Sequence, residues 1–201
     1  HSQIYSMVNL FTLSLDYFFP FLQYWKYVLS MKTPRAYASA AVLPNGEFWI
    51  TGGASRSNIL RTTEILSVRN EEWTIRNGPK MPRALIGHCF AVMSENELVI
   101  AGGYSPIEDD YSQNVDIYDM RRGKWYTKPW IPMIKNGPRI DSSCINFLFG
   151  TKRRVVMAGG WNNTAMEVTE YLDPNLQMWV TMGRNYSQGE PRQQVGFVLT
   201  L

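Results

Sequence analysis

The sequence of 201 residues is poor in the side chains from which catalytic and metal sites are built. It contains two histidines, His1 and His88, and two cysteines, Cys89 and Cys144. No zinc-ligand spacing, Ser-His-Asp order or glycine-rich phosphate loop occurs in it. We therefore expect a protein that is not an enzyme and that needs neither a cofactor nor a metal.

The two cysteines occupy similar places in successive segments, each early in an apolar stretch. No further cysteine or histidine lies at ligand spacing, so we expect two buried, unpaired thiols rather than a disulfide or a metal pair. His88 stands at the head of a predicted strand. A packed or hydrogen-bonded histidine is expected there rather than a metal ligand.

The sequence also lacks an uninterrupted apolar run and a strong charge of either sign. Residues 8–29 are rich in apolar side chains, but Asp16, Pro20 and Lys26 interrupt them, and a bilayer core needs about 20 mostly apolar residues. The formal net charge is +3, and the basic clusters 121–124 and 152–154 fall at expected hairpin turns. We predict no membrane span and no nucleic-acid partner.

Three patterns recur along the chain at intervals of roughly 50 residues, which is typical of stacked structural units. An acidic residue stands nine positions before a tryptophan in four places: Asp16 and Trp25, Glu64 and Trp73, Asp116 and Trp125, Glu170 and Trp179. A Pro-Arg dipeptide recurs at Pro34-Arg35, Pro82-Arg83, Pro138-Arg139 and Pro191-Arg192. A double glycine recurs at Gly52-Gly53, Gly102-Gly103 and Gly159-Gly160.

Each unit shows four short apolar runs separated by turn-forming residues, which predicts a four-stranded meander. One such sheet cannot bury both faces, so neighbouring sheets must pack around an axis as a β-propeller. We interpret Trp73, Trp125 and Trp179 as packing residues between the sheets, and the glycines as residues at crowded turns. We expect the arginine of each Pro-Arg pair to bind an acid of the neighbouring unit. Asp119 and Asp173 are expected to cap turns through backbone N–H groups.

Taken together, the Pro-Arg pair, the apolar strand, the double glycine, the acid and the later tryptophan resemble the kelch repeat over residues 16–201. Segments 25–35 and 114–125 are similar to the family consensus, although its tyrosine after the acid is kept only as Tyr118, with Leu66 and Leu172 elsewhere. The resemblance implies an all-β kelch-type propeller with complete four-stranded blades at 35–82, 83–138 and 139–191. Partial blades are expected at 16–34 and 192–201, after an upstream remnant at 1–15. Either the chain is a fragment, or its end pieces share one blade and close a small ring.

The resemblance further implies a protein-interaction module that binds through the loops after each double glycine, at 54–60, 104–113 and 161–166. The candidate partner-binding residues are Arg56, Asn58, Tyr104, Glu108, Asp109, Tyr111, Trp161 and Asn163. For the acidic stretch 108–110, the alternative interpretation is a solvated loop tip. By resemblance, the partner is a substrate of a cullin-type ubiquitin ligase, with BTB and BACK domains upstream, or an actin filament. Either function implies a cytoplasmic protein.

Two alternatives remain beside this interpretation. Asn162 and Asn185 head glycosylation triplets in predicted loops, which fits a secreted or cell-surface recognition domain. Some kelch-type propellers are copper oxidases, whose site needs two histidines, two tyrosines and a cysteine joined to one tyrosine. With His88 assigned to the core, we expect no such site.

Overall fold

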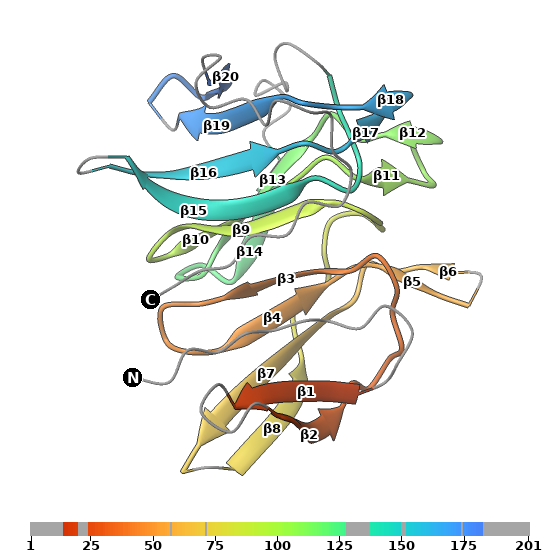
Figure 1. Ribbon diagram of the computed structural model, residues 1–201, viewed down its shortest axis with the longest axis vertical. Helices are drawn as coiled ribbons and strands as arrows, with labels where there is room; N and C mark the ends of the chain where they lie inside the picture. The colour runs from red at the N-terminus through yellow and green to blue at the C-terminus, as the bar shows by residue number, and fades with distance from the viewer. Residues whose placement is uncertain are drawn as a thin grey trace.

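The computed structural model describes residues 14–19, 24–56, 58–70, 72–127, 137–149, 152–173 and 175–182. All regular structure in these ranges is β-strand, which confirms the predicted all-β class (Figure 1). Within the same ranges, no helix is long and apolar enough to cross a membrane. Residues 192–201, which were expected to form the first strand of another blade, lie outside the described residues.

Three four-stranded antiparallel sheets make up most of the structure, and each follows the predicted meander order. We call them blades 1, 2 and 3. Blade 1 contains β3 (Ser39–Val42), β4 (Phe48–Thr51), β7 (Thr63–Arg69) and β8 (Glu72–Asn77). Blade 2 contains β9 (Cys89–Ser94), β10 (Glu97–Ala101), β13 (Val115–Asp119) and β14 (Lys124–Thr127). Blade 3 contains β15 (Ser143–Phe149), β16 (Lys152–Ala158), β19 (Thr169–Asp173) and β20 (Met178–Thr181).

Four smaller antiparallel pairs complete the fold. β1 (Ser14–Phe19) pairs with β2 (Tyr24–Ser30), in the segment expected to supply two strands of a partial blade. The other three are short hairpins that follow each double glycine, between the second and third strands of a blade. They are β5 (Ala54–Ser55) with β6 (Asn58–Ile59), β11 (Tyr104–Ser105) with β12 (Asp110–Tyr111), and β17 (Trp161–Asn162) with β18 (Thr164–Ala165).

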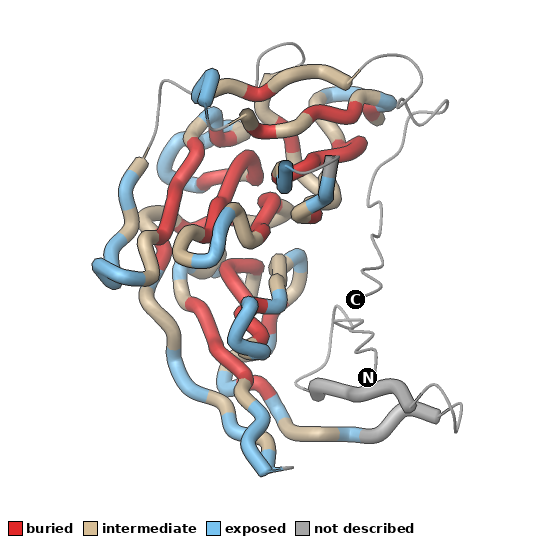
Figure 2. The backbone as a smooth tube through the Cα atoms, turned by 90° about the vertical axis from the view of Figure 1, so that its left-hand side faces the viewer, coloured by how far each residue is buried: buried red, intermediate tan, exposed pale blue. Residues whose placement is uncertain are grey.

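The first strands of the three blades lie side by side, with β9 between β3 and β15. Buried residues concentrate along the strands, and exposed residues gather at the turns (Figure 2). Apolar side chains fill both seams between blades. The seam of blades 1 and 2 holds Leu43, Trp49, Ile65, Phe90, Leu98, Ile100 and Tyr118. The seam of blades 2 and 3 holds Cys89, Ala91, Val99, Ala101, Val115, Ile117, Val155, Met157, Leu172 and Trp179.

The repeat tryptophans lie on the fourth strand of each blade. Trp179 is completely buried, whereas Trp73 and Trp125 are half-buried. Trp125 packs against Tyr118 with 5.0 Å between ring centroids, and Tyr118 in turn packs against Trp49 of blade 1 at 5.4 Å. The aromatic residue at position 118 therefore links the two blades through tilted ring contacts, which add to simple area burial.

The double glycines lie where backbones approach closely. Gly53 and Gly103 both have φ of +87°, and their amides donate to the carbonyls of Leu85 and Arg139 in the next blade, at 2.9 and 2.8 Å. A Cβ on Gly52 would lie 2.6 Å from the Leu85 carbonyl oxygen. Any larger residue at position 52 would push the blades apart, and it would also be strained at the φ of +59° found there.

The arginines of two Pro-Arg pairs form buried ion pairs with the repeat's own acid. Arg35 binds Glu64 at 2.7 Å and also donates to the carbonyls of Gly52 and Thr62. Arg139 likewise pairs with Glu170, and burial lowers the pKa of Arg139 to about 10. The expectation that these arginines bind an acid of the neighbouring unit was wrong, because each acid lies on the third strand of the arginine's own blade. The guanidinium reaches that strand across the double-glycine turn.

Asp119 and Asp173 cap the turns between the third and fourth strands, as expected. The Asp119 carboxylate accepts hydrogen bonds from the amides of Arg121 and Arg122 at 2.9 and 3.0 Å. Asp173 accepts hydrogen bonds from the amides of Asn175 and Leu176. Burial raises the pKa of Asp173, but these two hydrogen bonds and the nearby Arg154 outweigh that effect, so the pKa is lowered. In blades 2 and 3 the spacing between acid and tryptophan thus spans a capped four-residue turn, whereas in blade 1 the same spacing spans a two-residue turn between Arg69 and Glu72.

Cys89 and Cys144 form a disulfide between blades 2 and 3, so the expectation of two unpaired thiols was wrong. The strand register supplies the reason. Cys89 pairs with Ala101, next to the double glycine, whereas Cys144 pairs with Met157, one residue further from it. Side chains alternate along a strand, so this offset of one residue turns the two sulfurs toward each other. Closing a loop with a sequence separation of 55 is worth about 4 kcal/mol in the chain-entropy view.

His88 is buried at the seam of blades 1 and 2, where its Nε2 lies 2.8 Å from the Thr51 hydroxyl. Burial lowers its pKa to about 3, because the charged imidazolium is poorly solvated there. His88 is therefore the packed, hydrogen-bonded histidine that the sequence predicts, and it is neutral in the folded protein at neutral pH.

This burial predicts acid sensitivity. In the unfolded chain His88 is protonated below about pH 6.5, whereas in the folded protein it stays neutral down to about pH 3. The contribution of His88 to the free energy of unfolding is therefore fully present above about pH 6.5 and is lost progressively as the pH falls toward about 3. The loss attributable to His88 approaches about 1.4 kcal/mol per pH unit. Urea unfolding at several pH values gives the free energy of unfolding of the wild type and of His88→Gln. The difference between the two pH dependences measures the loss that is due to His88. Parallel pH dependence of the two proteins would contradict the assignment.

Candidate binding surface

The three short hairpins project from the same end of the blades, and we call this end the hairpin face (Figure 1). A single backbone bridge anchors each hairpin to the segment that leads into its blade. The bridges join Ala36 to Ala54, Ile86 to Tyr104, and Ile140 to Trp161. The hairpins are therefore short loops fixed on a rigid base, the arrangement in which binding residues are commonly found.

The hairpin of blade 2 is the longest and carries an acidic tip. Glu108, Asp109 and Asp110 are exposed, and Ile107 beside them is 81% exposed. The Tyr104 hydroxyl donates to Asp109 at 2.9 Å, and this hydrogen bond, together with burial and the nearby acids, raises the pKa of Tyr104. Asp109 has a φ of 49°, so the tip is a tight turn. The hairpin thus presents to solvent an apolar side chain that directly precedes three acidic residues in the sequence.

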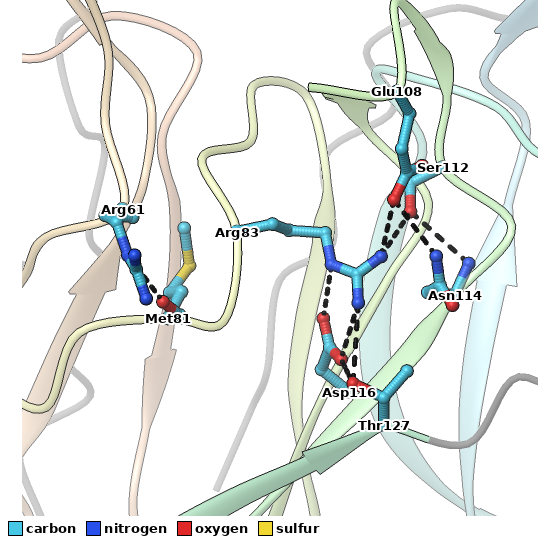
Figure 3. Close-up of polar contacts among 8 residues, drawn as sticks. All are labelled: Arg61, Met81, Arg83, Glu108, Ser112, Asn114, Asp116 and Thr127. Carbon is cyan, nitrogen blue, oxygen red and sulfur yellow. Dashed lines mark hydrogen bonds and ion pairs between the residues drawn. The ribbon is translucent and has the colours of Figure 1, made fainter. Parts of the chain in front are cut away.

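Arg83 fastens this hairpin to the core of blade 2 (Figure 3). Its guanidinium lies between two carboxylates, with Nη1 donating to Glu108 at 2.6 Å and Nε lying 3.1 Å from Asp116. Asn114 also donates to Glu108, at 3.0 Å, and the Thr127 hydroxyl donates to Asp116 at 2.6 Å. The network connects an exposed loop residue to a carboxylate that is 1% exposed.

Blade 2 departs here from the pattern of the other two blades. The equivalent bridges of Ala36, Ile86 and Ile140 show that Leu85 occupies the place of Arg35 and Arg139. The Pro-Arg pair of blade 2 therefore lies two residues earlier than its apparent counterparts. Leu85 is buried, and Arg83 reaches Asp116 from nearer the surface, with its side chain 14% exposed. This shift is what brings an arginine within reach of Glu108.

The charge on Asp116 depends on that arginine. Burial raises the pKa of Asp116, and the nearby Glu108 adds to the effect. Hydrogen bonds from Thr127 and the positive charge of Arg83 oppose it. Arg83 is thus a structural partner for Asp116 and a positioning residue for the hairpin.

The predicted site residues fall into three groups on the hairpin face. Tyr104, Glu108, Asp109 and Tyr111 share the hairpin of blade 2, where Glu108 is engaged within the chain by Arg83 and Asn114. Arg56 and Asn58 are exposed on the hairpin of blade 1, and Arg56 has a φ of 54°. Trp161 and Asn163 belong to the hairpin of blade 3, where Trp161 is half-buried and Asn163 is exposed.

Sequence reasoning missed Arg83 and Ile107. Arg83 was placed with Arg35 and Arg139 because all three follow a proline. Spacing to the double glycine was a signal in blade 1, since Arg35 lies 17 residues before Gly52 and Leu85 lies 17 residues before Gly102. It did not separate Arg83 from Arg139, which lie 19 and 20 residues before Gly102 and Gly159. The described residues contain no group of three or more histidine, cysteine, aspartate or glutamate side chains placed to hold a metal.

No protein-family model matches the chain. Kelch-like protein 26 of Danio rerio is 27% identical over 168 residues, which cover 81% of this chain and 26% of that protein. Multiple epidermal growth factor-like domains protein 8 of Homo sapiens is 27% identical over 97 residues, or 46% of this chain and 3% of that protein. Among solved structures, that of YjhT matches with a TM-score of 0.65 and 14% identity, covering 85% of this chain and 52% of YjhT. The chain thus spans about a quarter of Kelch-like protein 26, and the similarities support a kelch-like domain.

Replacing Arg83 by glutamine is expected to lower the free energy of unfolding by about 1–3 kcal/mol at neutral pH, because buried Asp116 loses its cation. The raised pKa of Asp116 rises further in this variant, so protonation relieves the penalty as pH falls. Urea unfolding of the wild type and Arg83→Gln should show a smaller difference in the free energy of unfolding at about pH 5 than at about pH 7. Glu108→Gln is the matched control and should cost below about 1 kcal/mol, since it removes only the partly exposed contact. Equal costs for the two variants would refute the buried role of Arg83.

Proposed function

We propose that the chain is a kelch-type interaction domain that binds a protein partner through the hairpin face. The observation that carries this proposal is the Arg83 network. It holds the hairpin of blade 2 in one conformation while Ile107 and Asp109 remain exposed at its tip.

A loop that is ordered before binding loses less conformational entropy when a partner docks. The bridge between Ile86 and Tyr104, the Tyr104–Asp109 hydrogen bond and the Arg83–Glu108 pair all reduce the freedom of this hairpin. An exposed isoleucine beside fixed carboxylates supports a partner that offers an apolar pocket rimmed by basic groups. Arg56 and Asn58 on the hairpin of blade 1 would extend the same surface.

We infer that the chain acts by binding rather than by catalysis. His88 is buried and held neutral at a blade seam. The similarity to Kelch-like protein 26 supports protein partners in general. Substrate recognition for a cullin-type ubiquitin ligase, with BTB and BACK domains in the same protein, and actin binding are two specific forms of this proposal.

Ile107→Asp is expected to reduce partner binding at least about tenfold, because a carboxylate would be desolvated in an apolar contact. Leu176→Asp is the matched control, since Leu176 is 62% exposed in the turn of blade 3 remote from the hairpin face. Both variants should keep the wild-type melting temperature. Quantitative cross-linking and mass spectrometry of tagged wild type and variants in cells would measure the loss, and Arg56→Ala should weaken the same cross-links. Equal losses in both aspartate variants would exclude the hairpin face.

A second candidate is a secreted or cell-surface interaction domain, and the Cys89–Cys144 disulfide favours it over the cytoplasmic alternative. Disulfides persist in oxidising compartments and are rare in the cytosol. The triplet at Asn162 lies in the short hairpin β17–β18, with Asn163 and Thr164 exposed. The triplet at Asn185 lies outside the described residues.

This candidate predicts that the chain, expressed through a eukaryotic secretory pathway, carries an N-linked glycan. Digestion with an N-glycosidase should lower its mass, and Asn162→Gln should remove the part of the shift that belongs to the hairpin. Thiol alkylation under denaturing conditions should leave both cysteines unlabelled. An unchanged mass together with two free thiols in protein from its natural source would favour the cytoplasmic location.

A further inference from the structure

The disulfide joins blades 2 and 3 at the end from which their hairpins leave. Cys89 is the first residue of β9 and pairs with Ala101, directly before Gly102 and the hairpin β11–β12. Cys144 pairs with Met157, two residues before Gly159 and the hairpin β17–β18. The covalent bond therefore lies beneath two of the three loops of the hairpin face.

The two seams between blades are built differently. At the seam of blades 1 and 2, large aromatic side chains interlock, with Trp49 against Tyr118 and Phe90 nearby in the same cluster. The side chain equivalent to Cys89 in blade 1 is Ser39, which donates a hydrogen bond to the His88 carbonyl. At the seam of blades 2 and 3, the residues contributed by blade 2 are small or aliphatic, such as Ala91, Ala101 and Val115. At this seam the disulfide and the buried Trp179 of blade 3 stand where the first seam has ring–ring contacts.

Polar contacts between described residues also join the second seam. Asn146 donates to the Val92 carbonyl at 2.6 Å, and the amide of Asp141 donates to the Gly87 carbonyl at 2.8 Å. Gly103 adds its backbone bond to Arg139. These contacts orient blade 3, but each is worth only a fraction of a covalent cross-link.

We propose that the Cys89–Cys144 disulfide is a redox-dependent clamp that fixes blade 3 against blade 2 and so sets the relative position of hairpins β11–β12 and β17–β18. Its consequence for partner binding rests on the function proposed above. The clamp itself does not, because it concerns the packing of the two blades alone.

The chemistry is thiol–disulfide exchange. A thiolate of a small-molecule or protein dithiol attacks one sulfur, forming a mixed disulfide and releasing the other cysteine as a thiolate, which takes up a proton. The second thiol of the reductant then resolves the mixed disulfide, so that two electrons pass to the protein and the reductant becomes a disulfide. Cys89 is 1% exposed and Cys144 is half-buried, which makes the Cys144 sulfur the more accessible point of attack.

Hydrogen exchange of the full chain, with and without a dithiol reductant, tests the clamp without any partner. Reduction is expected to speed amide exchange in β15–β20 at least about tenfold relative to β3–β8, and to lower the melting temperature by roughly 10 °C. The variant Cys89→Ser with Cys144→Ala introduces the residues that blade 1 carries at the equivalent strand positions, Ser39 and Ala40, so each substitution is one that a blade already accepts at that position. It should behave like the reduced wild type and should not respond to the reductant.

Unchanged exchange in blade 3 after complete reduction, verified by thiol alkylation, would overturn the clamp. So would a double-cysteine variant whose blade 3 exchanges as slowly as that of the oxidised wild type. If the double variant fails to fold, reduction of the wild type still decides the matter. If reduction leaves exchange in blade 3 unchanged but Ile107→Asp still weakens partner binding, the clamp is excluded and the proposed function stands. If reduction speeds exchange in blade 3 but Ile107→Asp has no effect on binding, the proposed function is excluded and the clamp stands.

Discussion

The close approach of backbones at the double glycines is the constraint on which the rest of the structure depends. Gly52 and Gly53 lie so near the lead-in segments of blades 1 and 2 that no Cβ fits without displacing a carbonyl. In return, the second glycine of each pair donates a hydrogen bond to the next blade in both described seams. Blade spacing, the depth of the apolar seams and the position of every hairpin follow from this contact.

Charge is arranged around the same turns. In blades 1 and 3, an arginine lies buried behind the double glycine and neutralises the repeat's acid, a role confined to the interior. In blade 2, Leu85 takes the interior place, and the cation moves to Arg83, which has one contact in the core and one on the loop. A single two-residue shift thus converts a structural ion pair into a support for an exposed hairpin.

Much of the fold could be predicted from the sequence because its signals are local. Apolar runs, capped turns at Asp119 and Asp173, and the glycine pairs each depend on neighbouring residues. The disulfide could not be predicted in the same way, because it depends on a register offset of one residue between Cys89 and Cys144 that resembles equivalence in the sequence. The partners of Arg35 and Arg139 were assigned to the wrong blade because each ion pair joins the lead-in segment to the third strand of the same blade, a tertiary contact with no local signal in the sequence. Arg83 was grouped with them because all three arginines follow a proline.

The structure places the predicted partner-binding residues on three short hairpins at one end of the blades. Composition indicated Tyr104, Glu108 and Asp109, but it could not reveal that Glu108 is held by Arg83 and Asn114 while Ile107 is exposed. The contact of Arg83 with Glu108 joins residues 25 positions apart, and the contact of Asn114 with Glu108 joins residues 6 positions apart. Neither contact follows a pattern that repeats along the chain.

The partial exposure of Arg83 has a consequence for how the blades respond to their solvent. Dissolved ions screen charges that water can reach and have little access to pairs enclosed in the interior. The side chains of Arg35 and Arg139 are 0% exposed, so ionic strength should barely affect their ion pairs. Among the described ion pairs of the repeat acids, that of blade 2 is therefore the one that couples an interior carboxylate to the surrounding electrolyte.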